Sequence, residues 1–218
     1  MIRTVSIVPA ILTNDEQSYR SQVESINTFT RRVQIDVTDG IFTPLKTLDI
    51  TDVWWPNNWS ADLHLMASNP SSYLETILKL NPSLCILQAE ASEDLRPTFQ
   101  ALKDVGIKVG LALLPTTFPG HVKQYIDIVD HVLIFAGQLG VQGAAADLMQ
   151  MEKISLVRKM KPELEIGWDG GANLSNIRTL AHADLDVINV GAAISRSENP
   201  AESFAQLVSE IDKNGVVL

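Results

Sequence analysis

Hydrophobic positions along the chain fall into short runs that alternate with longer amphipathic stretches. The short runs are rich in β-branched residues and read "VSIVP", "RVQIDV", "ADLHLM", "LCILQA", "KVGLALL", "HVLIFAG", "LEIGWDGG" and "DVINVGAAI". The stretches between them predict helices over 15–30, 47–55, 71–80, 93–105, 119–128, 147–160, 173–182 and 199–213. Start signals such as Asn14 before "DEQ" and Ser92 before "EDL" support these helices. Strands that alternate with helices favour parallel βα units.

Eight such units in 218 residues predict an α/β fold, one (β/α)₈ TIM-barrel domain that spans residues 1–218. The alternative is a doubly wound open sheet. That fold is expected to carry a glycine-rich turn after its first strand, and "IVPAIL" has none.

Polar side chains are predicted to share the inner face of the barrel. Successive side chains of a strand point to opposite faces, so "VQIDVT" turns Gln34, Asp36 and Thr38 toward the axis. The same alternation turns two further sets inward: Asp62, His64 and Met66, and Glu165, Gly167 and Asp169. We expect these polar groups near the carboxyl ends of the strands, where the active sites of such barrels lie.

Asp36 and Asp169 are the strongest candidates for chemistry. Each ends a strand, and each could instead cap a loop or a helix. Two such aspartates with His64 on the same inner face favour a functional site, in which His64 is a metal ligand or a proton-transfer group. Asp39, just before Gly40, is predicted to bond loop amides. Cys85 is predicted to be a small core residue on the helix-facing side.

Glycine marks a second cluster, in "FAGQLGVQGAAAD", "DGGANLSN" and "NVGAAIS". Loops after the seventh and eighth strands of such barrels commonly cradle a phosphate with backbone amides. We therefore predict a small phosphorylated ligand, bound near Gly140, Gly143, Gly170, Gly171, Gly191 and Ala192.

Composition limits the classes of partner that the protein is expected to bind. The net charge of −9 argues against nucleic acid and anionic membranes, while local amides can still bind a small anion. A single cysteine, no signal-peptide pattern and no apolar run near ~20 residues lead us to expect a cytoplasmic protein. We also expect a homo-oligomer, and the tryptophans of "WWPNNW" are suited to the core or to a subunit interface.

At these motifs the sequence resembles the ribulose-phosphate 3-epimerase family. The similarity runs from "SIVPAIL" through "IDVTDGIFTP" and "DLHLMASNP" to "WDGGANLSNI" and "VINVGAAI". The resemblance implies an isomerase that inverts C3 of a ketose phosphate, with Asp36 and Asp169 as acid and base on opposite faces of the sugar. It also implies a divalent metal, Zn, Mn, Fe or Mg, held by these aspartates, His64 and a second histidine.

Several family residues are replaced here. Gln34 stands where the second histidine is expected, and a neutral amide oxygen is a weak ligand for zinc. We therefore expect a weakened metal site. Gln88, Ala144 and Ala192 replace a histidine, a glutamine and a serine, and Ala10 replaces another serine. Thr38 and Phe135 replace methionines, whereas Met66 is kept. Gln34, Met66 and Gln88 are expected to contact the substrate, and the two glutamine amides can donate to its developing oxyanion.

Two classes of function follow from this pattern. One is a C3 epimerase acting on ribulose 5-phosphate and xylulose 5-phosphate, or on a related hexulose 6-phosphate. The alternative is a non-catalytic sugar-phosphate-binding homologue that has lost part of the metal site. An aspartate pair facing one cavity favours the enzyme, because two buried carboxylates are costly to keep.

Overall fold

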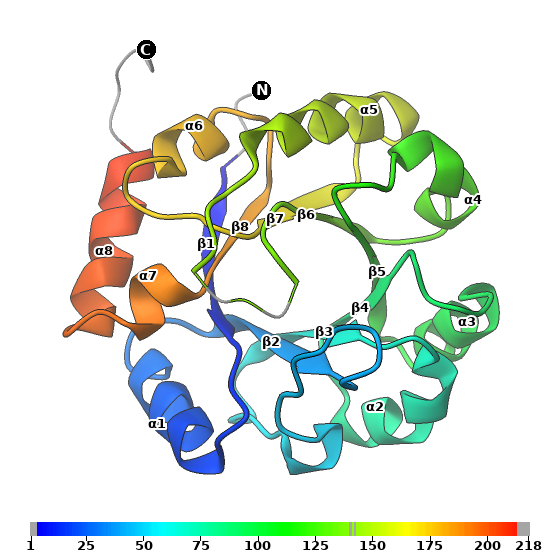
Figure 1. Cartoon of the computed structure of the whole chain (residues 1–218), viewed down its shortest axis with the longest axis horizontal. Coiled ribbons are helices and arrows are strands. Elements are labelled where there is room, and N and C mark those ends of the chain that lie inside the picture. The colour runs from blue at the N-terminus through cyan, green and yellow to red at the C-terminus, as the bar shows by residue number, and fades with distance from the viewer. Residues whose placement is uncertain (1–3, 140, 142, 213–218) are drawn as a thin grey trace.

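The computed structural model describes residues 4–139, 141 and 143–212. Its strands close into one barrel in chain order, β1 to β8, and every neighbouring pair is parallel, including β8 with β1. Figure 1 looks into this ring of strands, with the helices around it. The strands are β1 Ser6–Ile11, β2 Arg32–Thr38, β3 Ser60–Met66, β4 Leu84–Gln88, β5 Lys108–Leu113, β6 His131–Phe135, β7 Glu165–Asp169 and β8 Val187–Val190. The predicted barrel is confirmed, and the open sheet is excluded.

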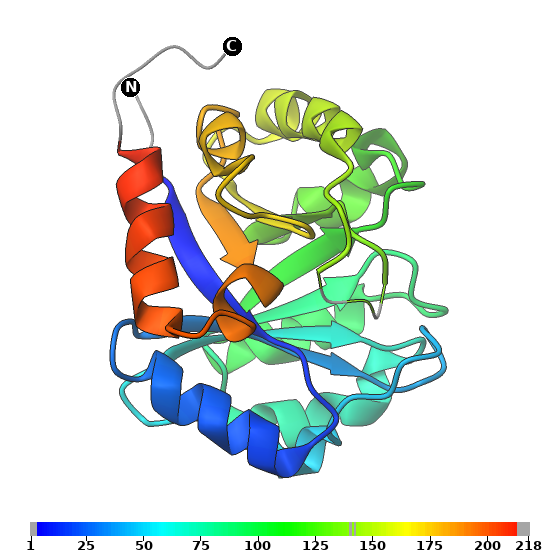
Figure 2. The same cartoon turned by 60° about the vertical axis from the view of Figure 1, so that its left-hand side comes forward.

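Helices connect the strands on the outside of the barrel. They are α1 Glu16–Ile26, α2 Leu74–Leu80, α3 Arg96–Asp104, α4 Lys123–Ile126, α5 Glu152–Met160, α6 Ile177–Ala181, α7 Ala192–Ser195 and α8 Pro200–Ile211. Short 3₁₀ turns lie at Ile50–Asp52, Pro70–Tyr73, Pro119–Val122 and Leu148–Met151. In Figure 2, α8 lies along β1 and α1 packs below it. Within the described part of the chain, no helix has the length and apolar content needed to cross a bilayer.

One predicted element is wrong. The segment 47–55 forms only a 3₁₀ turn at Ile50–Asp52, because Asp49 accepts a hydrogen bond from Thr51 and the chain extends again at Val53. The strand predicted in "DVINVGAAI" is present as β8 and covers the first part of this run. β8 stops at Val190, and α7 begins immediately after Gly191.

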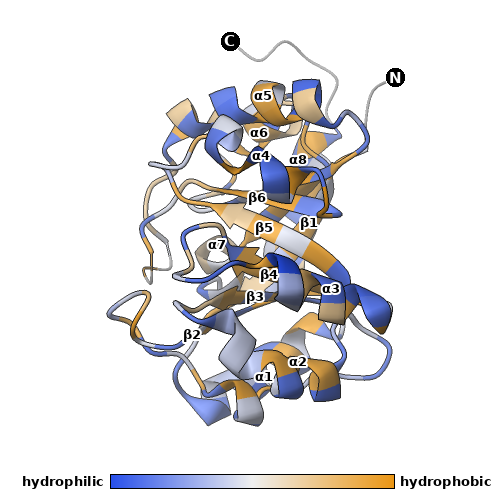
Figure 3. Cartoon of the chain, turned by 90° about the vertical axis from the view of Figure 1, so that its right-hand side faces the viewer, coloured by the Kyte–Doolittle hydropathy of each residue, from blue (hydrophilic) through white to orange (hydrophobic). Residues whose placement is uncertain are grey.

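The main core lies between the barrel and its helices. Val33, Ile35 and Val37 belong to it, as the alternation predicts, and so does Cys85, which is fully buried. Figure 3 shows largely hydrophobic strands and hydrophilic colour concentrated on helices and loops. Each fully buried aliphatic side chain contributes about 1.5–3 kcal/mol to folding. This packing holds the strands, and with them every side chain that faces the axis.

The inside of the barrel is apolar on one side and polar on the other. Leu84, Ile86, Ala112 and Leu133 form a separate apolar cluster on β4, β5 and β6. The polar inner residues come mainly from β2, β3 and β7, and they divide between the two ends of the barrel.

Asp62 and Glu165 do not lie where the sequence predicts. Both sit toward the amino end of the barrel, where Arg32 donates to Asp62 at 2.8 Å and to both Glu165 oxygens at 2.8 and 2.9 Å. His131 also contacts Glu165, with 2.8 Å between Nδ1 and Oε2. The alternation correctly predicts that both side chains face the inside of the barrel. Which end of the barrel they lie at depends on their position along the strand, and both residues lie at or near the start of their strands.

Candidate active site

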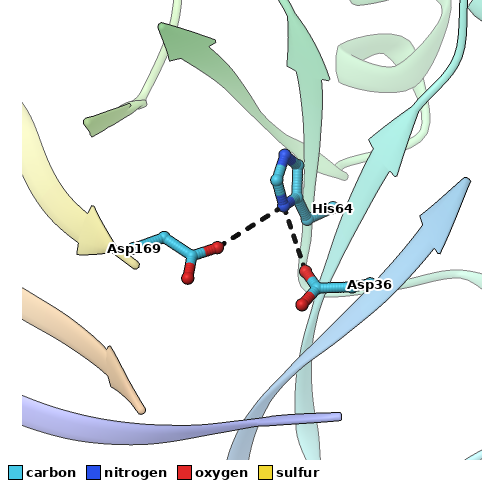
Figure 4. Close-up of side chains that lie close together, drawn as sticks. All are labelled: Asp36, His64 and Asp169. Carbon is cyan, nitrogen blue, oxygen red and sulfur yellow. Dashed lines mark hydrogen bonds and ion pairs between the residues drawn. The ribbon is translucent and has the colours of Figure 1, made fainter. Parts of the chain in front are cut away.

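Three side chains from different strands converge at the carboxyl end of the barrel. Asp36 comes from β2, His64 from β3 and Asp169 from the last position of β7. His64 Nδ1 lies 3.0 Å from Asp36 Oδ1 and 3.7 Å from Asp169 Oδ2. Figure 4 shows the two carboxylates on either side of the imidazole nitrogen. One donor atom of each residue lies within 4.8 Å of the others, so the three groups can act on one ligand or hold one ion.

Gln34 connects the two carboxylates from the side nearer the amino end of the barrel. Its Nε2 donates to Asp36 Oδ1 and to Asp169 Oδ2, both at 2.8 Å. Its Oε1 is buried and has no hydrogen-bond partner among the described residues. Gln34 is fully buried and does not line the cavity above the carboxylates. It therefore acts on the two aspartates, and the structure does not bring it to a position for direct substrate contact.

Gln88 lies behind His64. Its Nε2 is 2.9 Å from His64 Nε2, and its side chain is fully buried. When this amide donates to Nε2, the ring proton is on Nδ1, which faces the two carboxylates. Gln88 does not line the cavity, so the expectation that it contacts the substrate is not met. The reason is that β4 turns the amide toward the imidazole ring, which stands between it and the cavity.

A cavity of about 420 Å³ opens above these groups. Its walls include most of the predicted binding residues, namely Met66, Gly143, Gly170, Gly171, Gly191 and Ala192, together with Asp36, His64 and Asp169. Gly140 lies outside the described residues. The cavity thus joins the carboxylate pair to the glycine-rich loops, as the sequence predicts.

Two glycines of this wall cannot be replaced without moving backbone. Gly170 has φ +116°, and a Cβ there would lie 2.1 Å from the backbone nitrogen of Gly137. Gly171 has φ +70°, and a Cβ there would lie 2.2 Å from the nitrogen of Ala146. The loops after β6 and β7 therefore touch through bare backbone, which leaves their amides close to the cavity.

Comparison with known proteins identifies the family. The model of the ribulose-phosphate 3 epimerase family matches residues 6–195. The chain belongs to this family. A ribulose-phosphate 3-epimerase of Helicobacter pylori (strain J99) is 27% identical over 202 residues, which are 89% of this chain and 93% of that relative. The cytoplasmic isoform of rice is 28% identical over 214 residues, 94% of each chain. The chain is therefore a carbohydrate epimerase of the isomerase class.

Solved structures support the fold. A 3-hexulose-6-phosphate synthase superposes with a TM-score of 0.72 at 13% identity, over 95% of this chain and all of that one. KGPDC of Streptococcus mutans has a TM-score of 0.68 at 11% identity, over 95% of this chain and 97% of that one. At these identities the likeness shows the barrel and nothing about the reaction.

The carboxylate pair retains a proton near neutral pH. Burial, together with the negative charge of Asp36, raises the pKa of Asp169 to about 7, while His64 and Gln34 partly oppose this. Burial would lower the pKa of His64, but its hydrogen bond to Asp36 and the charges of both aspartates raise it above the ordinary value. The side chains of Asp36 and Asp169 are only 9% and 14% exposed. Two carboxylates with one shared proton can exchange it with a bound substrate.

Asp39 supports the loop after β2, as predicted. Its Oδ1 accepts from the amides of Ile41 and Phe42, both at 2.7 Å, and its Oδ2 accepts from Ser68 at 3.0 Å. Burial would raise the pKa of Asp39, but these backbone hydrogen bonds lower it below the ordinary value. An ionised Asp39 therefore ties the loop after β2 to the end of β3.

Arg196 is a cavity residue that the sequence reasoning missed. It lines the wall just after α7, and its Nη1 lies 3.1 Å from where a Gly143 Cβ would be. Among the described residues that line the cavity, it is the one lysine or arginine. It follows Ala192 by four residues, about one helical turn, so its position in the sequence could have revealed it.

Asn189 was also missed. It lies on the inner face of β8 between Val187 and Gly191, pairs in register with Asp169, and lines the cavity. The alternation in "VINVG" turns Asn189 inward together with Gly191, so the same rule that found Asp36 could have found it.

Proposed function

We propose that the protein inverts C3 of a phosphorylated ketose, interconverting ribulose 5-phosphate and xylulose 5-phosphate. The observation that carries this proposal is the pair of carboxylates, Asp36 and Asp169, which lie on either side of the His64 imidazole and line one cavity. Membership of the epimerase family supports the same reaction.

Asp36 and Asp169 would act as base and acid. Because its pKa is about 7, Asp169 starts with the proton, and Asp36 starts as the base. Asp36 removes the proton from C3, which leaves an enediolate across C2 and C3. Asp169 then delivers its proton to the opposite face of C3. This leaves Asp36 protonated and Asp169 ionised, the arrangement from which the reverse reaction starts. Return of the proton to Asp169 through solvent or the hydrogen-bonded groups restores the arrangement for the forward reaction.

The donor set fits a divalent metal ion. Asp36, His64 and Asp169 offer two carboxylate oxygens and one imidazole nitrogen within 4.8 Å of one another. The orphaned Oε1 of Gln34 is a further oxygen, which rotation of the amide would turn toward the two aspartates. These four residues would hold the ion, with Mn or Mg favoured over Zn because three of the four ligands are oxygens. When bound, the ion would supply positive charge beside the substrate oxygens as the enediolate forms.

The phosphate would bind at the opposite wall. Backbone amides near Gly143, Gly171 and Ala192 border the cavity, and the guanidinium of Arg196 lies against Gly143. A dianionic phosphate would benefit from this cation, because the same cavity holds two carboxylates and the whole chain has a net charge of −9.

The test is proton exchange at C3, followed by NMR in D₂O with purified protein of defined metal content. We expect deuterium at C3 and formation of the C3 epimer with ribulose 5-phosphate. Unphosphorylated ribulose should react far more slowly, since it lacks the phosphate contacts. Six-carbon ketose 6-phosphates are tested for C3 exchange in the same way. If no ketose phosphate exchanges its C3 proton, the protein is a binding homologue and the proposed reaction is wrong.

A further inference from the structure

Asn189 is a buried amide without a structural task. Its side chain is on the inner face of β8, and the residue is only 3% exposed. Its Oδ1 has no hydrogen-bond partner among the described residues. The strand does not need the amide, because β8 pairs with β1 and β7 through its backbone.

An apolar residue at this position would avoid an energetic cost. A buried acceptor without a partner destabilises the fold, whereas a valine such as the inward-facing Val187 would fill the same face. Asn189 is also the register neighbour of Asp169, yet the Asp169 carboxylate accepts hydrogen bonds from the side chain of Gln34 and the backbone of Gly170 instead. The amide therefore neither holds the strand nor orients the aspartate. The remaining space it can act on is the cavity that it lines.

In the proposed binding mode, Asn189 lies beside the reacting carbon, one inward residue of β8 before the proposed phosphate end. Asp169, at the same level of the barrel, would act on C3, and Gly191, the next inward residue of β8, borders the proposed phosphate site. Two residues of strand separate these levels by about 6.6 Å. In a ketose 5-phosphate, C4 is bonded to the reacting C3 on the phosphate side, so its hydroxyl is the first one met beyond the level of Asn189 toward Gly191.

We propose that Asn189 binds the C4 hydroxyl of the substrate and thereby selects the configuration at C4. The inference rests on the proposed function, which places C3 between the aspartates. The amide can donate to this hydroxyl and accept from it, so it satisfies an oxygen that is otherwise unpaired. A substrate that lacks the hydroxyl, or carries it on the opposite face, leaves the amide buried and unpaired, which is how a polar pocket discriminates between ligands.

The experiment compares two proteins on three ligands. Wild type and Asn189→Ala are assayed with ribulose 5-phosphate, with its 4-deoxy analogue, and with its C4 epimer. We expect kcat/KM of wild type to fall about 10- to 100-fold when the 4-hydroxyl is removed. Asn189→Ala should lose a similar factor with ribulose 5-phosphate and show no further loss with the 4-deoxy analogue. It should also discriminate less between the two C4 epimers.

A purely structural role predicts another result. It would reduce kcat/KM by the same factor for all three ligands, and that outcome would overturn the inference, as would an Asn189→Ala variant with unchanged preference. We expect the variant to fold at least as well as wild type, because the substitution removes an unpaired acceptor. If it does not fold, Asn189→Ser gives a second small side chain for the same comparison.

Binding measurements distinguish a failure of this inference from a failure of the proposed function. The dissociation constants of the three ligands are measured by calorimetry for wild type and Asn189→Ala, without reliance on turnover. Absence of C3 exchange in wild type would refute the epimerase proposal. Equal affinities for the 4-hydroxy and 4-deoxy ligands would refute the role of Asn189, whether or not the protein turns over.

Discussion

Two groups of carboxylates, each with a histidine, lie at opposite ends of the same barrel. At the amino end Arg32 bridges Asp62 and Glu165, and His131 contacts Glu165. At the carboxyl end, within the part of the chain that the structure describes, the neighbours that Asp36 and Asp169 share are His64 and the neutral amide of Gln34. The first group contains a permanent cation, and the second, within the described residues that form it, contains none.

This difference shifts the pKa values of the acidic groups at the two ends in opposite directions. Burial would raise the pKa of Glu165, but hydrogen bonds from His131 and Arg32, together with their charges, lower it well below its ordinary value. Burial and the charge of Asp36 instead raise the pKa of Asp169 to about 7. The amino-end network is a charge-compensated structural feature, whereas at the carboxyl end Asp169 keeps its proton up to near neutral pH. Neighbouring charge, more than residue type, therefore distinguishes a structural carboxylate from a reactive one.

The largest expected effect is on activity at the carboxyl end. Asp36→Asn and Asp169→Asn should each lower the rate of C3 epimerisation by about 10³-fold or more, because each removes a proton-transfer group. Either variant can still exchange a C3 proton of one epimer, since one carboxylate remains. Rates are measured by NMR with both epimers. Asp127→Asn, on the surface beside Lys123, is the matched control and should leave the rate unchanged.

The next effect is on stability at the amino end. Arg32→Met leaves Asp62, only 4% exposed, without its cation, so we expect the free energy of unfolding to fall by about 3 kcal/mol. Asp169→Asn should leave it unchanged or raise it, because it removes one of two facing carboxylates. Urea denaturation of both variants measures this contrast. Arg31→Met is the control, since among the described residues Arg31 donates to backbone oxygens of Asn27 and Thr30 and to no carboxylate. Equal destabilisation by Arg32→Met and Asp169→Asn would contradict the comparison.

Metal affinity tests how Gln34 alters the carboxyl-end site. Gln34→His should tighten Mn or Zn binding by about 10- to 100-fold, because an imidazole replaces a weak amide ligand between the two aspartates. Equilibrium dialysis with metal analysis gives the dissociation constants. Gln88→His also adds an imidazole, but on the far side of His64, and should have little effect. Wild type with affinity equal to that of Gln34→His would show that Gln34 does not weaken the site.

The smallest expected effect is on the pH dependence of stability. The folded-state pKa of Asp169, about 7, lies above its ordinary value of 3.8, so the folded protein binds more protons than the unfolded chain between these values. Stability from this group is therefore present at low pH and is lost as pH rises toward 7. Glu165 acts in the opposite sense, because its lowered pKa gives stability that is lost as pH falls below its ordinary value of 4.5.

Asp169→Asn should remove this loss of stability as pH rises toward 7. We expect its free energy of unfolding to fall by about 2 kcal/mol less than that of wild type between pH 5 and pH 7. Denaturation in EDTA at a series of pH values measures this. Parallel curves for the two proteins would mean that Asp169 has no raised pKa.

The sequence by itself determined which face each strand residue takes. Alternation placed Asp36, His64 and Asp169 on the inner face, and the eightfold strand–helix pattern predicted the barrel that brings them together. Glycine positions located the loops that border the cavity. These features are local, because a strand turns every second side chain to the same side whatever it packs against.

Tertiary structure alone decided which polar groups meet. Asp62 and Glu165 share the inner face with the site residues, yet they pair with Arg32 at the other end, because register and barrel closure set the level of each residue. Gln88 turned to His64, and Arg196 reached Gly143 from a different loop. Such contacts join residues far apart in sequence, and the charges they bring together decide whether a carboxylate is neutralised or keeps its proton.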